Sequence, residues 1–163
     1  MMKFLFTFLL SIPLLAQKPF YAQFRYFHLE TDNEKVLPDF AANALSAEVG
    51  YTKSFAKKWK IDFSGSISTS FINSSNLSSS RYEIGLFDQA TTGNQDFLTR
   101  IEKASLSYQN NKLKIKLGRQ VLNTPFINPQ DGRMRPSAEG GIYAEYKDFT
   151  FGYLYEMAPR GTM

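Results

Sequence analysis

The chain has 163 residues, with 19 lysines and arginines, 15 aspartates and glutamates, one histidine and no cysteine. The absence of cysteine excludes disulfides, thiolate metal sites and a cysteine nucleophile, and a single histidine excludes sites that need two imidazoles. The net charge of +4 comes from scattered cations, which argues against nucleic-acid binding. Aromatic residues make up 15% of the chain although mean hydropathy is −0.31, so apolar and polar residues must alternate finely.

The first segment, residues 1–16, has the features of a secretory signal peptide. Lys3 supplies a basic start, and an apolar run extends from Phe4 to Ala16. This run is too short to span a bilayer as a helix, which takes about 20 residues, and it matches the apolar part of an export signal. We therefore expect an exported protein that is periplasmic, secreted or inserted in the outer membrane. A buried N-terminal helix is the alternative.

Residues 17–38 show no clear periodicity, and we predict an N-terminal arm over 17–43. The arm carries alternating polar groups at His28, Glu30, Asp32 and Glu34, which raises the question of a cation site. Their spacing lacks the glycine of a calcium loop, so a solvated arm is favoured.

The next segments read as strands. Residues 39–49 fit a helix with Asp39 as N-cap, but alternation favours a strand over 44–52. The clearest pattern runs from Trp59 to Phe71, where all large apolar residues fall on one parity and lysine, aspartate and serine fill the other. A strand of this length, tilted by about 45°, covers roughly 30 Å of hydrocarbon, whereas strands in soluble proteins usually have about 5–6 residues.

The remaining alternation predicts a membrane barrel. Strands are predicted at 44–52, 59–71, 103–108, 112–117, 141–146 and 149–155. Short links at 53–58, 109–111 and 147–148 alternate with long ones at 72–96 and 120–138, which is typical of bacterial outer-membrane barrels. A closed single-chain barrel needs about eight strands, so six predict an incomplete one: an antiparallel transmembrane β-barrel of which residues 44–163 are the N-terminal part. Two further strands, in 20–29 and 81–87, are less favoured.

The alternation also assigns residues to faces and loops. Side chains two apart in a strand share a face, so a lumen lining and a lipid-facing stripe can be separated. The pore-lining candidates are Lys60, Asp62, Lys103, Lys112, Lys114 and Lys116. The lipid-facing or girdle candidates are Trp59, Ile61, Phe63, Tyr108, Leu113, Ile115, Leu117, Phe149, Phe151 and Tyr153. Arg119, Arg133 and Arg135 flank the Pro-rich loop, where they either grip a carboxylate or pin the loop to the wall.

One stretch resembles a known family. Leu113–Tyr146 contains Gly118-Arg119, Leu122, Thr124-Pro125-Phe126, Asp131, Arg133, Pro136 and Glu139-Gly140 in a strand–loop–strand context. On these residues the chain resembles the outer-membrane porin D (OprD) family of Gram-negative bacteria. The resemblance implies an eighteen-stranded barrel that acts as a substrate-selective channel for small solutes, often carboxylates or amino acids. The chain is similar to the first third of such a barrel.

These observations lead to one expected function and two alternatives. We expect a passive, substrate-selective diffusion channel whose partners are outer-membrane lipid and small solutes, with no cofactor, no metal and no nucleic acid. The oligomeric state is left open between monomer and trimer. The alternatives are a small soluble barrel or sandwich that binds an apolar ligand or partner, and a non-conducting, adhesin-like surface barrel. The sequence contains no nucleophile–base set and no phosphate-binding glycine loop after a strand, which argues against an enzyme.

Overall fold

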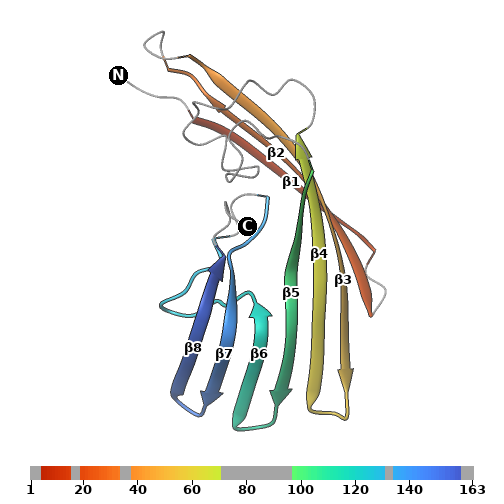
Figure 1. Cartoon of the computed structure of the whole chain (residues 1–163), viewed down its shortest axis with the longest axis vertical. Helices are drawn as coiled ribbons and strands as arrows, with labels where there is room; N and C mark the ends of the chain where they lie inside the picture. Colours follow the sequence, from red (N-terminus) through yellow and green to blue (C-terminus); the bar gives the residue numbers. More distant parts are fainter. Residues whose placement is uncertain (1–4, 16–18, 34–37, 71–96, 131–133, 159–163) are drawn as a thin grey trace.

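The computed structural model describes residues 5–15, 19–33, 38–70, 97–130 and 134–158. Within these ranges the chain is all-β, and its strands form a single antiparallel sheet in sequence order (Figure 1). The eight strands are β1 (Leu5–Leu15), β2 (Phe20–Thr31), β3 (Phe40–Phe55), β4 (Trp59–Ser70), β5 (Leu98–Gln109), β6 (Leu113–Gln120), β7 (Ala138–Tyr146) and β8 (Phe149–Ala158).

The sheet is open. Each strand pairs with its neighbour in sequence, and the two outer strands, β1 and β8, do not pair with each other. The described strands therefore form a curved wall and not a closed barrel (Figure 1). No second layer of secondary structure packs on this sheet within the described residues.

The six predicted strands are confirmed, with ends that shift by a few residues. The segment that also fitted a helix is a strand, because β3 runs without a break from Phe40 to Phe55. The predicted strand over 59–71 is β4, which ends at Ser70 in the described part of the chain.

The prediction of an arm over 17–43 was wrong for its central part, where the less favoured strand at 20–29 is present. Residues Phe20–Thr31 form β2, which pairs with β3 from Phe20↔Tyr51 to Thr31↔Phe40. Its alternation is hidden because both faces carry aromatic side chains, with Tyr21 and Phe27 on one and Phe24 on the other. The further strand considered at 81–87 lies outside the described residues.

The first strand coincides with the predicted export signal. Leu5–Leu15 pairs antiparallel with β2, from Leu5↔Thr31 to Leu15↔Ala22. The signal peptide stays a prediction, since a paired strand in the full chain is compatible with later removal of the segment. Removal would leave β2 as the edge of the sheet.

Short turns join the strands at one end of the sheet, which we call the turn end. The turns lie at 56–58, 110–112 and 147–148, and Figure 1 shows them together at the lower rim. The Asn110 side-chain oxygen accepts hydrogen bonds from the backbone N–H groups of Lys112 and Leu113, at 2.9 and 2.8 Å. Ala56, Lys57 and Lys147 have left-handed backbone, with φ of 46°, 61° and 51°. These conformations let the chain reverse within a few residues.

Longer connections join the strands at the opposite end, the loop end. The link between β6 and β7 reaches far across the sheet, because Met134 packs in one buried apolar cluster with β2 and β3 side chains. The members of this cluster are Phe27, Leu29, Phe40, Ala42, Ala44 and Met134. A buried apolar cluster therefore lies under this link.

Candidate functional site

The two faces of the sheet differ in chemistry. Directly paired residues of antiparallel strands share a face, so the register assigns each strand position to a side. The row that contains Trp59 and Tyr108 is apolar, and the next row contains Lys60 and Ser107. We call the side of Trp59 the apolar face and the side of Lys60 the polar face, and the candidate site lies on the polar face.

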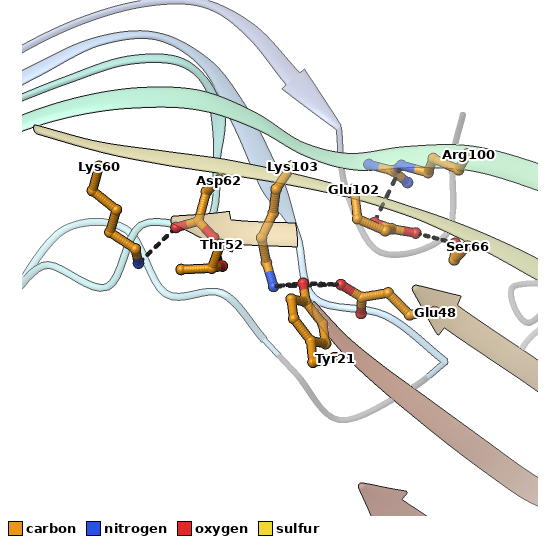
Figure 2. Close-up of polar contacts among 9 residues, drawn as sticks. All are labelled: Tyr21, Glu48, Thr52, Lys60, Asp62, Ser66, Arg100, Glu102 and Lys103. Carbon is orange, nitrogen blue, oxygen red and sulfur yellow. Dashed lines mark hydrogen bonds and ion pairs between the residues drawn. The ribbon is translucent and has the colours of Figure 1, made fainter. Parts of the chain in front are cut away.

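A tyrosine, a glutamate and a lysine form the centre of this site (Figure 2). The Tyr21 hydroxyl donates to a carboxylate oxygen of Glu48 at 2.8 Å. The Lys103 ammonium donates to the Tyr21 oxygen at 3.0 Å and lies 3.4 Å from the same Glu48 oxygen. Three strands, β2, β3 and β5, thus supply one hydrogen-bonded ion pair.

A glycine makes this arrangement possible. The register places Tyr21, Gly50, Ser64 and Lys103 in one row across four strands. A Cβ atom at position 50 would lie only 2.1 Å from the Tyr21 ring. The missing side chain lets the ring lie flat over β3, and the hydroxyl then reaches the β5 lysine.

A second group of contacts surrounds Asp62 on β4. Its carboxylate lies 2.7 Å from the Lys60 ammonium and also accepts a hydrogen bond from the Thr52 hydroxyl (Figure 2). Both lining candidates on β4, Lys60 and Asp62, are therefore partners of each other. This part of the wall presents a neutral pair and not an isolated charge.

A bulge in β5 adds a third group. Ser64 pairs with Lys103 while Gly65 pairs with Ile101, so Glu102 is an extra residue opposite β4. The Glu102 side chain is only 2% exposed, accepts a hydrogen bond from Ser66 at 2.5 Å and lies 3.7 Å from the Arg100 guanidinium (Figure 2). Consecutive residues Glu102 and Lys103 consequently both face the polar side.

The predicted lysine row is split by the structure. Lys114 lies on the polar face of β6, 3.1 Å from Glu145, whose same carboxylate oxygen accepts a hydrogen bond from Tyr143 at 2.7 Å. Lys116 pairs in register with Tyr143 and Ser107 on this face, and its ammonium contacts no carboxylate within ion-pair distance among the described residues. Lys112 precedes β6 and is exposed in the 110–112 turn. Only two of the three lysines therefore belong to the strand.

The loop arginines have different surroundings. Arg119 lies on β6, 2.6 Å from Glu156 of β8, which ties the two strands together across Gly140. Arg135 is buried in the link between β6 and β7. Arg133 lies outside the described residues.

Further contacts hold the loop end together. Arg100 donates to the backbone oxygen of Ala158 at 3.2 Å, which connects β5 with the end of β8. The buried Glu139 accepts a hydrogen bond from the Leu122 N–H at 3.2 Å. Two charged side chains of the loop end, Arg100 and Glu139, are therefore buried and hydrogen-bonded to the backbone.

The apolar face carries the predicted lipid-facing residues. The register places all of them in apolar rows, for example Ile61 with Leu106 and Leu117, and Phe151 with Ala144. Phe63 is 52% exposed and Phe149 is 77% exposed. Rings also gather at the turn end, where Trp59 makes an edge contact with Tyr108 at 5.0 Å and stacks on Phe55 at 6.5 Å between centroids.

Among the described residues, His28 is the centre of two side-chain contacts. His28 lies 3.5 Å from Glu30 and within hydrogen-bond distance, 2.9 Å, of Asn43. Asp32 is exposed beyond the end of β2, and Glu34 lies outside the described residues. Among the residues that the structure describes, no group of three or more His, Cys, Asp or Glu side chains is placed to hold a metal ion.

Sequence reasoning missed several members of the site. Tyr21 and Glu48 were overlooked because the strand at 20–29 was not favoured and because β3 carries its one acidic residue among small side chains. Arg100 and Glu102 have the parity of the apolar residues Ala104 and Leu106, and only the bulge moves them to the polar face. The only sequence feature that could have indicated their position is the run of charged residues in Thr99–Lys103.

Comparisons with known proteins give no further assignment. No family model, no curated protein and no solved structure matches the chain. Within the described ranges, no helix is long and apolar enough to cross a membrane.

Proposed function

We propose that this chain forms the N-terminal part of an outer-membrane porin, similar to the porin D (OprD) family, that lets small solutes such as carboxylates or amino acids diffuse passively. The observation that carries the proposal is the contrast between the faces of one sheet. The apolar face exposes Trp59, Ile61 and Phe63, while the opposite face of the same strand carries Lys60 and Asp62. Lipid against the apolar face and water against the polar face would solvate each set of side chains favourably.

The polar face suits a selective lining. Its charges occur as pairs and networks, so a solute meets alternating donors and acceptors and is held weakly enough to leave. Lys116 differs from Lys60, Lys103 and Lys114, because those three have carboxylate partners. Lys116 is therefore the lysine that we expect to attract anions most strongly.

The sheet edges constrain the proposal. Unpaired backbone groups in hydrocarbon cost several kcal/mol each, so both edges of this sheet need strand partners in a membrane. In the proposed assembly the edge of β8 pairs with further strands of the complete barrel. An enzyme activity is not proposed.

The proposal is tested by electrical recording from the complete gene product in planar bilayers. We expect ohmic channels, and we expect Lys116→Glu to lower the anion-to-cation permeability ratio severalfold, with a smaller decrease for Lys114→Glu, which already has Glu145 as a partner. The matched control is Lys53→Glu, whose backbone pairs with Ile61 on the apolar face, and its selectivity should equal that of the wild type.

Two results would overturn the proposal. A reconstituted, folded protein without conductance would favour the adhesin-like barrel. A protein that folds and stays monomeric in water without detergent would favour the soluble alternative. An unchanged permeability ratio in Lys116→Glu would leave a channel but remove this lysine from its lining.

A further inference from the structure

The turn end carries a concentration of lysines beside the apolar face. Lys57 and Lys58 lie in the 56–58 turn, Lys112 in the 110–112 turn and Lys147 in the 147–148 turn, and all are exposed. Asp148 is the one acidic residue within these three turns. The turn end is therefore distinctly basic, although the whole chain carries a net charge of only +4.

Three of these lysines line one hollow. An open hollow of about 620 Å³ lies between the first two turns. Its walls are Lys57, Lys58, Gln109, Asn110, Asn111, Lys112, Leu113 and Tyr146. The lining thus combines ammonium groups, side-chain amides and two residues of the apolar face.

The position of the hollow points to its occupant. Leu113 and Tyr146 pair with each other in a row of the apolar face, so the hollow opens where that face ends. Trp59 and Tyr108, whose rings are in contact, stand on the same face in the neighbouring strands. Rings of this kind prefer the level of lipid headgroups, which would put the lysines at the height of the phosphates.

The backbone holds the hollow in shape. The Gln109 N–H donates to the Lys58 carbonyl at 2.8 Å, which ties the first turn to the second. The Lys147 N–H donates to the Lys112 carbonyl at 3.2 Å, which ties the second turn to the third. Because neighbouring turns are fixed to each other, a bound anion would need little ordering of the chain.

From these observations we propose that the hollow between the 56–58 and 110–112 turns binds the headgroup of an anionic glycerophospholipid, with Lys57, Lys58 and Lys112 around the phosphate. The acyl chains would continue along Leu113 and Tyr146 onto the apolar face. The inference rests on the membrane insertion in the proposed function, but it does not depend on conduction.

The single tryptophan provides the measurement. Trp59 directly follows Lys58, and no other residue of the chain is a tryptophan. The gene product is reconstituted in phosphatidylcholine vesicles that contain brominated phosphatidylglycerol or brominated phosphatidylcholine, and quenching of Trp59 fluorescence reports the relative affinity of each lipid. We expect phosphatidylglycerol to bind at least tenfold more tightly, and each of Lys58→Gln and Lys112→Gln to reduce that preference about fivefold.

A matched control separates this hollow from a diffuse attraction. Lys53→Gln removes the same charge near the turn end without lining the hollow, and it should keep the wild-type preference. Equal quenching by both brominated lipids, or an equal loss in Lys53→Gln, would overturn the inference. Soluble glycerol phosphate that relieves the quenching at a concentration similar to that of the brominated phosphatidylglycerol would also overturn the inference, because the hollow would then bind free phosphate.

Conductance of the same vesicles keeps the two proposals apart. A non-conducting protein that still prefers phosphatidylglycerol would remove the channel and leave the lipid site. A conducting protein without lipid preference would remove the lipid site and leave the channel.

Discussion

The two ends of the sheet are built in different ways. At the turn end, contacts join residues that are close in sequence or on adjacent strands, such as Phe55 with Trp59, and the charged side chains are exposed. At the loop end, several charged side chains are buried, among them Arg100, Glu102 and Glu139, and contacts join distant segments, such as Arg100 with Ala158. The comparison suggests that the turn end folds from local signals, whereas the loop end depends on the assembled sheet.

The largest effect is expected for the buried carboxylate of the loop end. Glu102→Ala removes the partner of Arg100 and of Ser66, and breaking a buried ion pair costs about 3–5 kcal/mol. Denaturant unfolding in detergent, followed by Trp59 fluorescence, measures the loss. The double variant Arg100→Met with Glu102→Leu should lose much less. A loss below about 1 kcal/mol in Glu102→Ala would mean that this end is not held by buried charge.

A smaller loss of stability is expected for a substitution midway between the two ends of the sheet. Gly50→Leu would displace the Tyr21 ring and break its hydrogen bonds to Glu48 and Lys103, at about 1 kcal/mol each. The same unfolding experiment should give a loss of about 2 kcal/mol, and a much smaller one in a Tyr21→Ala background. Equal losses of stability in both backgrounds would show that Gly50 is needed for the backbone conformation of β3 and not for the placement of the Tyr21 ring.

The contact between the Trp59 and Tyr108 rings at the turn end should contribute less to stability. A double-mutant cycle of Trp59→Leu and Tyr108→Leu is expected to give a coupling of about 1 kcal/mol, typical of an edge-to-face pair, with unfolding followed by circular dichroism. The control cycle pairs Trp59 with Phe149, which lies four strands away on β8 and should show no coupling. Coupling in the control would indicate that the rim rings act together and not through neighbours.

The smallest effect is expected in a turn. Ala56 has φ of 46°, a conformation that costs a non-glycine residue about 1 kcal/mol. Ala56→Gly relieves this cost but adds freedom to the unfolded chain, so stability should change by less than about 0.5 kcal/mol. Ala47→Gly in the interior of β3 is the control and should lose about 1 kcal/mol. A similar loss at both positions would contradict the turn geometry.

Most of the turn end could be predicted from the sequence. Asn110 predicts a turn, because its side-chain oxygen can accept hydrogen bonds from backbone N–H groups of the turn. The alternation around Trp59 predicts which residues share a face of the sheet. These signals act over a few residues. They were sufficient to place Lys60, Asp62, Lys103, Lys114 and Lys116 on the polar face.

The loop end could not be predicted in this way. Nothing local shows that Met134 packs against Phe27 and Leu29, because the contact depends on how the sheet curves. Tyr21 was missed because β2 has rings on both faces, so its period of two is not visible in hydropathy. The channel function and the family resemblance stay proposals, supported by the two-faced sheet.

The bulge in β5 has a consequence for how this gene can vary. Arg100 faces the polar side only because the extra residue Glu102 resets the alternation between Lys103 and Ile101. An in-frame deletion of the Glu102 codon would restore uninterrupted pairing and keep the hydrogen-bonded ladder. With the turn-side half of the strand in place, Ile101 would still pair with Gly65 on the apolar face and Arg100 with Ser66 on the polar face. Loss of this codon would therefore remove the Glu102 carboxylate without moving another side chain to the opposite face, whereas loss of a codon from the regularly paired part of β5 would exchange the faces on one side of the deletion.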